Sequence, residues 1–227
     1  MIPEPARQIA TVLVILIMAS CLSAQQKKDN EEIFGRGEAL VAANCGDCLN
    51  ASREGLQEGI RLAEQAVQLG YPDKVTAYKL IASALRTMAV VYSRPDSEDQ
   101  KALLQRELEV HKQLIELSPN DSGIIYSYAR SVEAVNGKAA AVPLLRQVVA
   151  LNPNHDQARY VLGLCLIQLD QKEQGISELR TAFERTTDSA LSVRIAHDLS
   201  DTLRILGRNK EANLVLDKLR RRQDSSR

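Results

Sequence analysis

The sequence predicts an all-α fold made of antiparallel helix pairs that repeat along the chain. The clearest pair lies in residues 156–189, where apolar residues recur at helical spacing around Gly163 and again around Gly175 and Ala182. Because a small side chain lets a neighbouring helix approach closely, this alternation of small and large residues specifies two packed helices. The composition agrees, since 44% of residues are hydrophobic but only 4% are aromatic and none is tryptophan.

The same pattern recurs on both sides of this pair. Pro119 and Pro153 are 34 residues apart, and each follows a helix end that reads Leu-Ser-Pro-Asn or Leu-Asn-Pro-Asn. Proline cannot continue a helix, so each one marks the end of a helix pair. We therefore expect helix pairs at residues 122–155, 156–189 and 190–227, the last including the C-terminal tail.

This pattern resembles the tetratricopeptide-repeat (TPR) family, whose period is about 34 residues, over roughly residues 56 to 222. The helix Val75 to Tyr92 fits the family's first helix. The stretch Ser93 to Asp99 is expected to be a loop insertion in which Ser97 or Asp96 caps the next helix. The resemblance implies a TPR-like α-solenoid of about four to five repeats. The other expected segments are a signal peptide at 1–24, a flexible tether at 25–36, a degenerate first repeat with a Cys-x-x-Cys motif at 37–72 and a stretched repeat at 73–121.

Charge gives the chain no global preference for a partner. Lysine and arginine together number 29, as do aspartate and glutamate, so the formal net charge is zero. A neutral chain does not attract nucleic acid or an anionic bilayer through its overall field. We therefore expect no nucleic acid among its partners, and any electrostatic preference must be local.

The N-terminus has the pattern of an export signal. Ile9 to Ala19 is an unbroken apolar run preceded by Arg7. The run is shorter than the about 20 residues that cross a bilayer, and it has the length of the apolar core of a secretory signal. Cleavage after Ala24 is the favoured interpretation. The alternatives are a bacterial lipoprotein box with a lipid on Cys21, or an uncleaved anchor. We expect a periplasmic or secreted protein with no membrane span after cleavage, lipid-anchored only if Cys21 is modified.

Three cysteines lie beyond this N-terminal segment. Cys45 and Cys48 form a Cys-x-x-Cys motif, for which a disulfide is favoured because an exported chain meets an oxidising compartment. A c-type haem site would need a histidine directly after the motif, but Leu49 stands there. A thioredoxin-like site would need a preceding strand, which the sequence does not show, and both thiols could also stay reduced and packed. Cys165 lies among apolar residues of a helix and is expected to be a buried thiol.

No catalytic or metal-binding constellation is visible in the sequence. His111, His155 and His197 are far apart and lack metal-ligand spacing. His111 falls on the inward side of its helix, where a packed imidazole is expected. The chain also lacks a Gly-x-Ser-x-Gly motif and a Gly-rich phosphate loop. We therefore expect a protein that is not an enzyme and that holds no metal or cofactor.

The TPR resemblance also implies a binding surface, because the first helices of the family's repeats line a concave groove. By register, five basic side chains and two tyrosines face this groove against the acidic Glu133 and Asp201, so the groove is expected to be locally positive. Arginine and tyrosine are the groups that bind carboxylate-bearing peptides. The residues expected to bind a partner are Lys79, Arg86, Tyr126, Arg130, Tyr160, Arg194 and Arg204.

Two functions remain open at this point. The favoured one is an exported, non-enzymatic scaffold that binds an acidic protein or peptide through this groove. The alternative is a redox or haem-linked envelope protein that uses Cys45 and Cys48, with the repeats as a docking module, although Leu49 opposes haem. In the last helix, Leu214 projects away from the apolar side and is expected to be exposed, which suggests a homodimer contact through the C-terminal helix.

Overall fold

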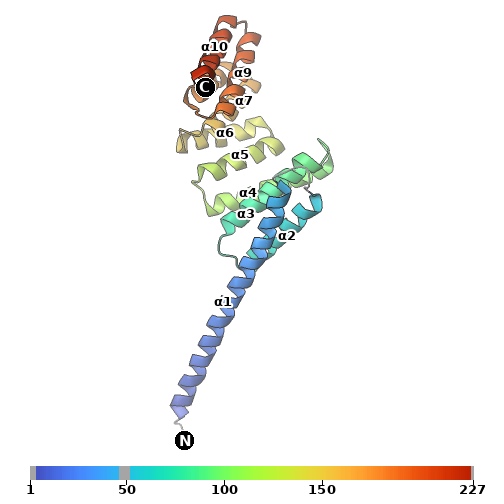
Figure 1. Ribbon diagram of the computed structural model, residues 1–227, viewed down its shortest axis with the longest axis vertical. Coiled ribbons are helices and arrows are strands. Elements are labelled where there is room, and N and C mark those ends of the chain that lie inside the picture. The colour runs from blue at the N-terminus through green and yellow to red at the C-terminus, as the bar shows by residue number, and fades with distance from the viewer. Residues whose placement is uncertain (1–3, 46–51, 226–227) are drawn as a thin grey trace. The chain divides into compact units, whose positions relative to one another are not determined.

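The computed structural model describes the backbone of residues 4–45 and 52–225 and the side chains of residues 23–43 and 52–224 (Figure 1). These residues form ten α-helices and one π-helix, and none of them lies in a β-strand, so the predicted all-α fold is confirmed. The helices form two compact units, unit 1 (Met1–Leu114) and unit 2 (Ile115–Arg227). Among the described residues, no helix combines the length and the apolar character needed to cross a membrane.

Unit 2 contains three pairs of adjacent helices. Asp121, His155 and Asp188 cap the first helix of each pair, accepting backbone N–H bonds at 2.8, 3.2 and 3.0 Å. Each pair therefore begins at a residue whose side chain satisfies the free N–H groups of the first turn. The pairs are α5 (Ser122–Asn136) with α6 (Lys138–Leu151), α7 (Asp156–Gln168) with α8 (Lys172–Arg185), and α9 (Ser189–Ile205) with α10 (Asn209–Ser225).

Two glycines lie at the contact between α7 and α8. A Cβ atom on Gly163 would lie 2.8 Å from Leu179 Cδ2 and 3.0 Å from the Gly175 carbonyl oxygen. A Cβ atom on Gly175 would lie 2.6 Å from the Gly163 carbonyl oxygen and 2.6 Å from Ile167 Cγ1. The two backbones therefore touch where the sequence predicts small residues, and this close approach buries Leu179 completely.

Unit 1 begins with a similar glycine contact, between α1 (Glu4–Cys45) and α2 (Arg53–Gln68). A Cβ atom on Gly59 of α2 would lie 2.6 Å from Val41 Cγ2 and 3.0 Å from the Gly37 carbonyl oxygen. The sequence pattern predicts α2, but the expected first helix of this degenerate repeat fits the family pattern poorly. The structure places that first helix earlier in the chain, so that Gly37 meets α2.

The structure differs from the tether expected at residues 25–36, because these residues continue the helix α1. Asn30 Nδ2 donates a 2.6 Å hydrogen bond to the Leu69 carbonyl oxygen, and the Phe34 ring stacks on Tyr71 with centroids 4.2 Å apart. Asn30 and Phe34 are both buried. The polar composition suggested a flexible segment, but its few inward residues recur at helical spacing and anchor it to the end of α2. The first helix pair therefore begins near Asn30 rather than at residue 37.

The second pair of unit 1 also differs from expectation. α3 (Lys74–Thr87) continues through the π-helix η1 (Met88–Tyr92), and α4 (Glu98–Leu117) has 20 residues against 14 in α6. The connecting loop spans only residues 93–97, so the extra length assigned to a loop insertion lies mostly in the helices. Of the two predicted caps, Ser97 or Asp96, Ser97 caps α4: its Oγ accepts a 3.1 Å hydrogen bond from a backbone N–H of the first turn.

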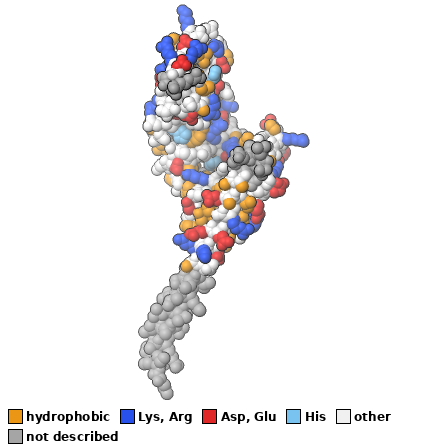
Figure 2. Space-filling model, in the orientation of Figure 1, with side chains coloured by type: hydrophobic (Ala, Val, Ile, Leu, Met, Phe, Trp, Pro, Cys, Tyr) orange, Lys and Arg blue, Asp and Glu red, His pale blue; other side chains and the backbone are white. Residues whose placement is uncertain are grey.

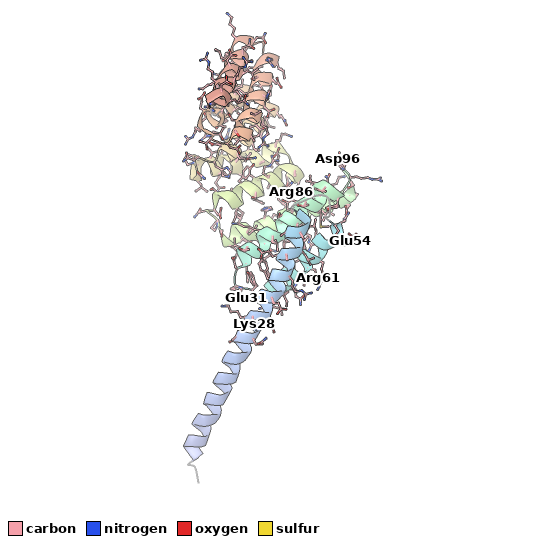
Figure 3. The ribbon with its side chains drawn as sticks, viewed as in Figure 1. Lys28, Glu31, Glu54, Arg61, Arg86 and Asp96 are labelled. Carbon is pink, nitrogen blue, oxygen red and sulfur yellow. The ribbon has the colours of Figure 1, made fainter. Side chains whose placement is uncertain are left out.

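An ion pair with a buried carboxylate joins α3 to α4. Arg86 is labelled in Figure 3. Its Nε donates to Glu107 Oε1 at 3.0 Å, and only 2% of Glu107 is exposed. The buried His111 lies one turn later, with Nδ1 3.1 Å from the Glu107 carbonyl oxygen. Because a carbonyl oxygen only accepts, Nδ1 carries the proton of the neutral ring. Burial lowers the pKa of His111 to about 4, and the charge of Arg86 acts in the same direction.

This buried histidine should make the stability of the fold depend on pH. Its folded-state pKa of about 4 lies below the ordinary value of 6.5, so the unfolded chain binds the proton first as the pH falls. The free energy of unfolding should therefore decrease from about pH 6.5 down to about pH 4, by about 3 kcal/mol in total. Above that range His111 is neutral in both states and contributes no pH dependence. Urea titrations at a series of pH values measure the change.

Two variants separate His111 from the other groups that titrate in the same range. His111→Leu should lose this component of the pH dependence, whereas His197→Gln, which changes an exposed histidine, should keep it. If the free energy of unfolding changes with pH in the same way for the wild type and His111→Leu across the whole range, His111 is not held neutral by burial.

Candidate functional site

Three helices of unit 2 carry five of the seven residues predicted to bind a partner. Tyr126 and Arg130 lie on α5, Tyr160 on α7, and Arg194 and Arg204 on α9. Each helix buries its apolar side in the core of unit 2, which leaves these five side chains half-buried or exposed. The name α5–α7–α9 face is used for Tyr126, Arg130, Tyr160, Arg194 and Asp198.

Side-chain contacts connect the three helices across this face. The Tyr160 hydroxyl on α7 donates to Asp198 Oδ2 on α9 at 2.5 Å. The ring centroid of Tyr126 on α5 lies 4.7 Å from that of His155, the residue that caps α7. Both tyrosines also pack against the hydrophobic core. The two rings are therefore held in place without a partner.

The environment keeps both tyrosines protonated. Burial raises the pKa of Tyr160 to about 12, and the hydrogen bond to Asp198 acts in the same direction. Burial also raises the pKa of Tyr126. The charges of Arg130 and Arg194 oppose both shifts, so both arginines lie within electrostatic range of both rings. The face thus combines neutral hydroxyl groups with two guanidinium groups.

One arginine of this face has no acidic partner. Arg130 pairs with Glu133 at 2.6 Å. Arg204, which lies on α9 outside the α5–α7–α9 face, pairs with Asp201 at 3.4 Å. Arg194 is exposed and forms no ion pair or side-chain hydrogen bond with any residue that the structure describes. An anionic group of a partner could therefore bind Arg194 without displacing an existing pair.

The local positive charge is weaker than the sequence predicts. The three arginines of α5 and α9 stand beside three acidic residues, Glu133, Asp198 and Asp201. Sequence reasoning missed Asp198 because its register position corresponds to Val161, which is apolar and buried in the clearest repeat. Charges of both signs are also mixed over the surface that Figure 2 shows. The face is therefore mixed in charge, with Arg194 as its uncompensated cation.

The remaining two predicted residues, Lys79 and Arg86, lie on α3 in unit 1. Lys79 is exposed, whereas Arg86 is bound to the buried Glu107 of α4. Arg86 thus has a structural partner in its own helix pair, 21 residues later in the sequence. Replacing it would disturb α3 and α4, so Arg86 is a poor probe of binding. A single groove that includes all seven residues stays a prediction.

The cysteine pair lies beyond what the structure describes. Cys48 and the side chains of Cys21 and Cys45 are outside the described residues, so the disulfide, the lipid anchor and the redox alternative stay predictions. Cys165 is 1% exposed, and burial raises its pKa to about 11, in agreement with the expected packed thiol. Within the described part of the chain, no group of three or more His, Cys, Asp or Glu side chains is arranged to hold a metal ion.

Comparisons with known proteins bear on the fold and the family. A family model described as tetratricopeptide repeat matches residues 139–195, which run from α6 into α9. No curated protein matches the sequence. A solved structure titled "Crystal structure of MamA" superposes with a TM-score of 0.61 at 16% identity, covering 77% of this chain and 92% of that chain. A structure of MamA, residue 41 to the end, from Desulfovibrio magneticus RS-1 gives a TM-score of 0.60 at 19% identity, covering 83% and 96%.

At these identities the likeness to MamA shows the fold alone. The fold is a TPR-like helical solenoid, as the sequence predicts, and it contains the repeat that the family model recognises in unit 2. Such repeats present helix faces to other proteins, which agrees in general terms with a protein-interaction scaffold. The tetratricopeptide-repeat match thus covers residues 139–195, and the chain as a whole has the fold of a TPR-like helical solenoid.

Proposed function

We propose that this protein is an exported scaffold without enzymatic activity, and that it binds another protein through the α5–α7–α9 face. The observation that carries the proposal is the exposed Arg194, within electrostatic range of two tyrosines that are already fixed by neighbouring helices. Aromatic and arginine side chains dominate the binding energy of many protein interfaces. Because the two rings are already ordered, a partner that covers them causes little further loss of side-chain entropy.

The chemistry of the face defines the partner more narrowly than a general preference for acidic proteins. A broad acidic tract would meet Glu133, Asp198 and Asp201 as well as the arginines, which is unfavourable. A single carboxylate can form a bidentate pair with Arg194. Apolar side chains on either side of it can pack on the two tyrosine rings. The expected partner is therefore a segment with one carboxylate among apolar residues.

Charge reversal at Arg194 tests this proposal. A photo-crosslinking residue at the exposed position 197 of α9 captures the partner in the native organism, and mass spectrometry identifies it. Affinity for the purified partner should then fall about tenfold or more in Arg194→Glu, because a hydrogen bond to a charged group contributes about 1.5 to 3 kcal/mol. The melting temperature should stay unchanged, since Arg194 has no ion pair with a described residue.

Arg204→Glu is the matched control, because Arg204 lies on the same helix but is paired with Asp201. It should reduce the affinity much less than Arg194→Glu. Crosslinking at Ser177, which is exposed on α8, should capture little of the same partner. Equal binding by the wild type and Arg194→Glu would contradict the proposed role of this face.

Export of the chain is part of the proposal and rests on the N-terminal pattern. The apolar run Ile9 to Ala19 is followed by the small residues of the expected cleavage site after Ala24. Residues 23–29 of α1 are exposed, and among the side chains of α1 that the structure describes, Asn30 is the first that is buried. Cleavage after Ala24 would thus leave the contacts of Asn30 and Phe34 with the end of α2 intact.

The intact mass of the protein from the native organism tests this part. A mass equal to residues 25–227 is expected, which corresponds to cleavage after Ala24 and a free exported chain. A mass that fits a chain beginning at a diacylated Cys21 would show that the protein is lipid-anchored and is not cleaved after Ala24. The mass of the full chain, recovered from the cytoplasm, would contradict export.

A further inference from the structure

Two ion pairs join α8 and α10 on a part of unit 2 that the α5–α7–α9 face does not include. Arg180 of α8 pairs with Glu211 of α10, and Lys218 Nζ of α10 lies 2.6 Å from Glu184 Oε1 of α8. The long side chains of these pairs span the space between the helices. An opening remains on the surface between the two ion pairs, and the helix backbones do not fill it.

This opening is an open pocket of about 350 Å³, lined by the four charged side chains of the two ion pairs and by four apolar residues. Its apolar lining includes Phe183 and Leu199, which are almost fully buried, and Leu214 and Val215 of α10. The guanidinium of Arg222 lies 4.5 Å above the Phe183 ring, and its Nη1 donates a 2.6 Å hydrogen bond to the Phe183 carbonyl oxygen. These contacts fix Phe183 in place, so the pocket has a firm wall.

Leu214 is the apolar residue at the mouth of this pocket, and 68% of it is exposed, as the sequence predicts. A second hollow of about 570 Å³ adjoins the first, because Leu214 and Lys218 line both. The second hollow adds Asp217, Arg221 and Arg222. The pocket is therefore continuous with a hollow in which basic residues outnumber acidic ones.

The unpaired charge of the second hollow is positive. Lys218 is paired with Glu184, and Asp217 lies 3.5 Å from Arg220. Arg221 is exposed and forms no ion pair or side-chain hydrogen bond with any described residue. A partner that brings a carboxylate to Arg221 would thus gain a pair without breaking one.

We propose that the α8–α10 groove, lined by Phe183, Leu199, Leu214, Val215, Lys218 and Arg221, binds an acidic amphipathic segment of another protein. An apolar side chain of the segment enters the pocket between the two ion pairs, and a carboxylate that follows it pairs with Arg221. Burial of an apolar anchor in a preformed pocket is the usual source of binding energy at such a site. The proposal is independent of the function assigned to the α5–α7–α9 face.

Charge also decides against a second copy of this chain as the occupant. A symmetric contact through α10 would bring together two copies of a surface whose unpaired charge, that of Arg221, is positive. Like charges placed together oppose association. An acidic partner avoids this repulsion and uses the same exposed Leu214.

The test selects peptides on the immobilised full chain from a phage-displayed library of random peptides. Peptides that depend on the groove should carry an apolar residue followed by acidic residues. Their affinity should fall about tenfold or more in Leu214→Ser and in Arg221→Glu. Both side chains are exposed, so neither change should alter the melting temperature.

Two matched variants complete the test. Ile205→Ser removes another exposed apolar side chain, 83% exposed on α9, and should leave binding unchanged. Arg194→Glu should also leave binding of these peptides unchanged. The test of the α8–α10 groove is therefore separate from the test of the α5–α7–α9 face. If no selected peptide depends on Leu214 and Arg221, or if the dependent peptides lack acidic residues, the proposal is wrong. A concentration-dependent dimer that Leu214→Ser abolishes would assign the groove to a second copy instead.

Discussion

The close approach of paired helices at glycine is the constraint on which both units depend. At the α7–α8 contact, the Gly163 carbonyl oxygen would lie 2.6 Å from a Cβ atom on Gly175. The Gly37 and Gly59 contact brings α1 and α2 together in the same way. With so short a distance between backbones, the large apolar side chains beside each glycine reach across and fill the core. Leu179 and Leu56 are fully buried for this reason.

The packed helix pairs also leave two surfaces of unit 2 exposed, one on its first helices and one on its second helices. The first helices of unit 2 lie close enough for the Tyr160 hydroxyl to reach Asp198 on the next first helix. The tyrosines are thereby ordered, while Arg194 keeps its charge free among the described residues. The second helices are joined instead by long ion pairs, such as Lys218 with Glu184, which leave an opening between α8 and α10. Two surfaces of different chemistry thus arise from one repeat geometry.

In unit 1, the buried side of α4 lacks the small residues that bring paired helices close together. The buried residues of α4 include no glycine or alanine but do include Glu107 and His111. Beside the apolar side chains that α4 shares with α3 in the core, an ion pair between Arg86 and Glu107 joins the two helices. Such a pair is most sensitive to the loss of Arg86, because the buried carboxylate of Glu107 would be left without compensation.

The sequence predicts helix pairs in unit 2 because its prolines, Pro119 and Pro153, and its small residues are local signals that recur about once in each repeat. It could not predict the polar contacts between repeats. Asp198 sits at a register position that is apolar in the clearest repeat, and Glu107 meets Arg86 across 21 residues of sequence.

The start of the first repeat was also missed, since Asn30 and Phe34 stand in a polar segment whose composition resembles a tether. Only their contacts with Leu69 and Tyr71 reveal that the segment belongs to the repeat. In the stretched pair, the added residues lengthen η1 and α4 instead of the loop, because the sequence pattern specifies the number of extra residues but not which element contains them.

The sign of a glycine-to-alanine change tests the central constraint most directly. In a helix interior this change normally stabilises by up to about 1 kcal/mol. Gly35→Ala should follow that rule, because a Cβ atom there would have no neighbour within 4 Å. Gly175→Ala should instead lower the free energy of unfolding, by about 1 to 3 kcal/mol, because its Cβ atom would meet the backbone of α7. If chemical denaturation shows that Gly175→Ala is as stable as Gly35→Ala, the helix pairs do not depend on this close contact.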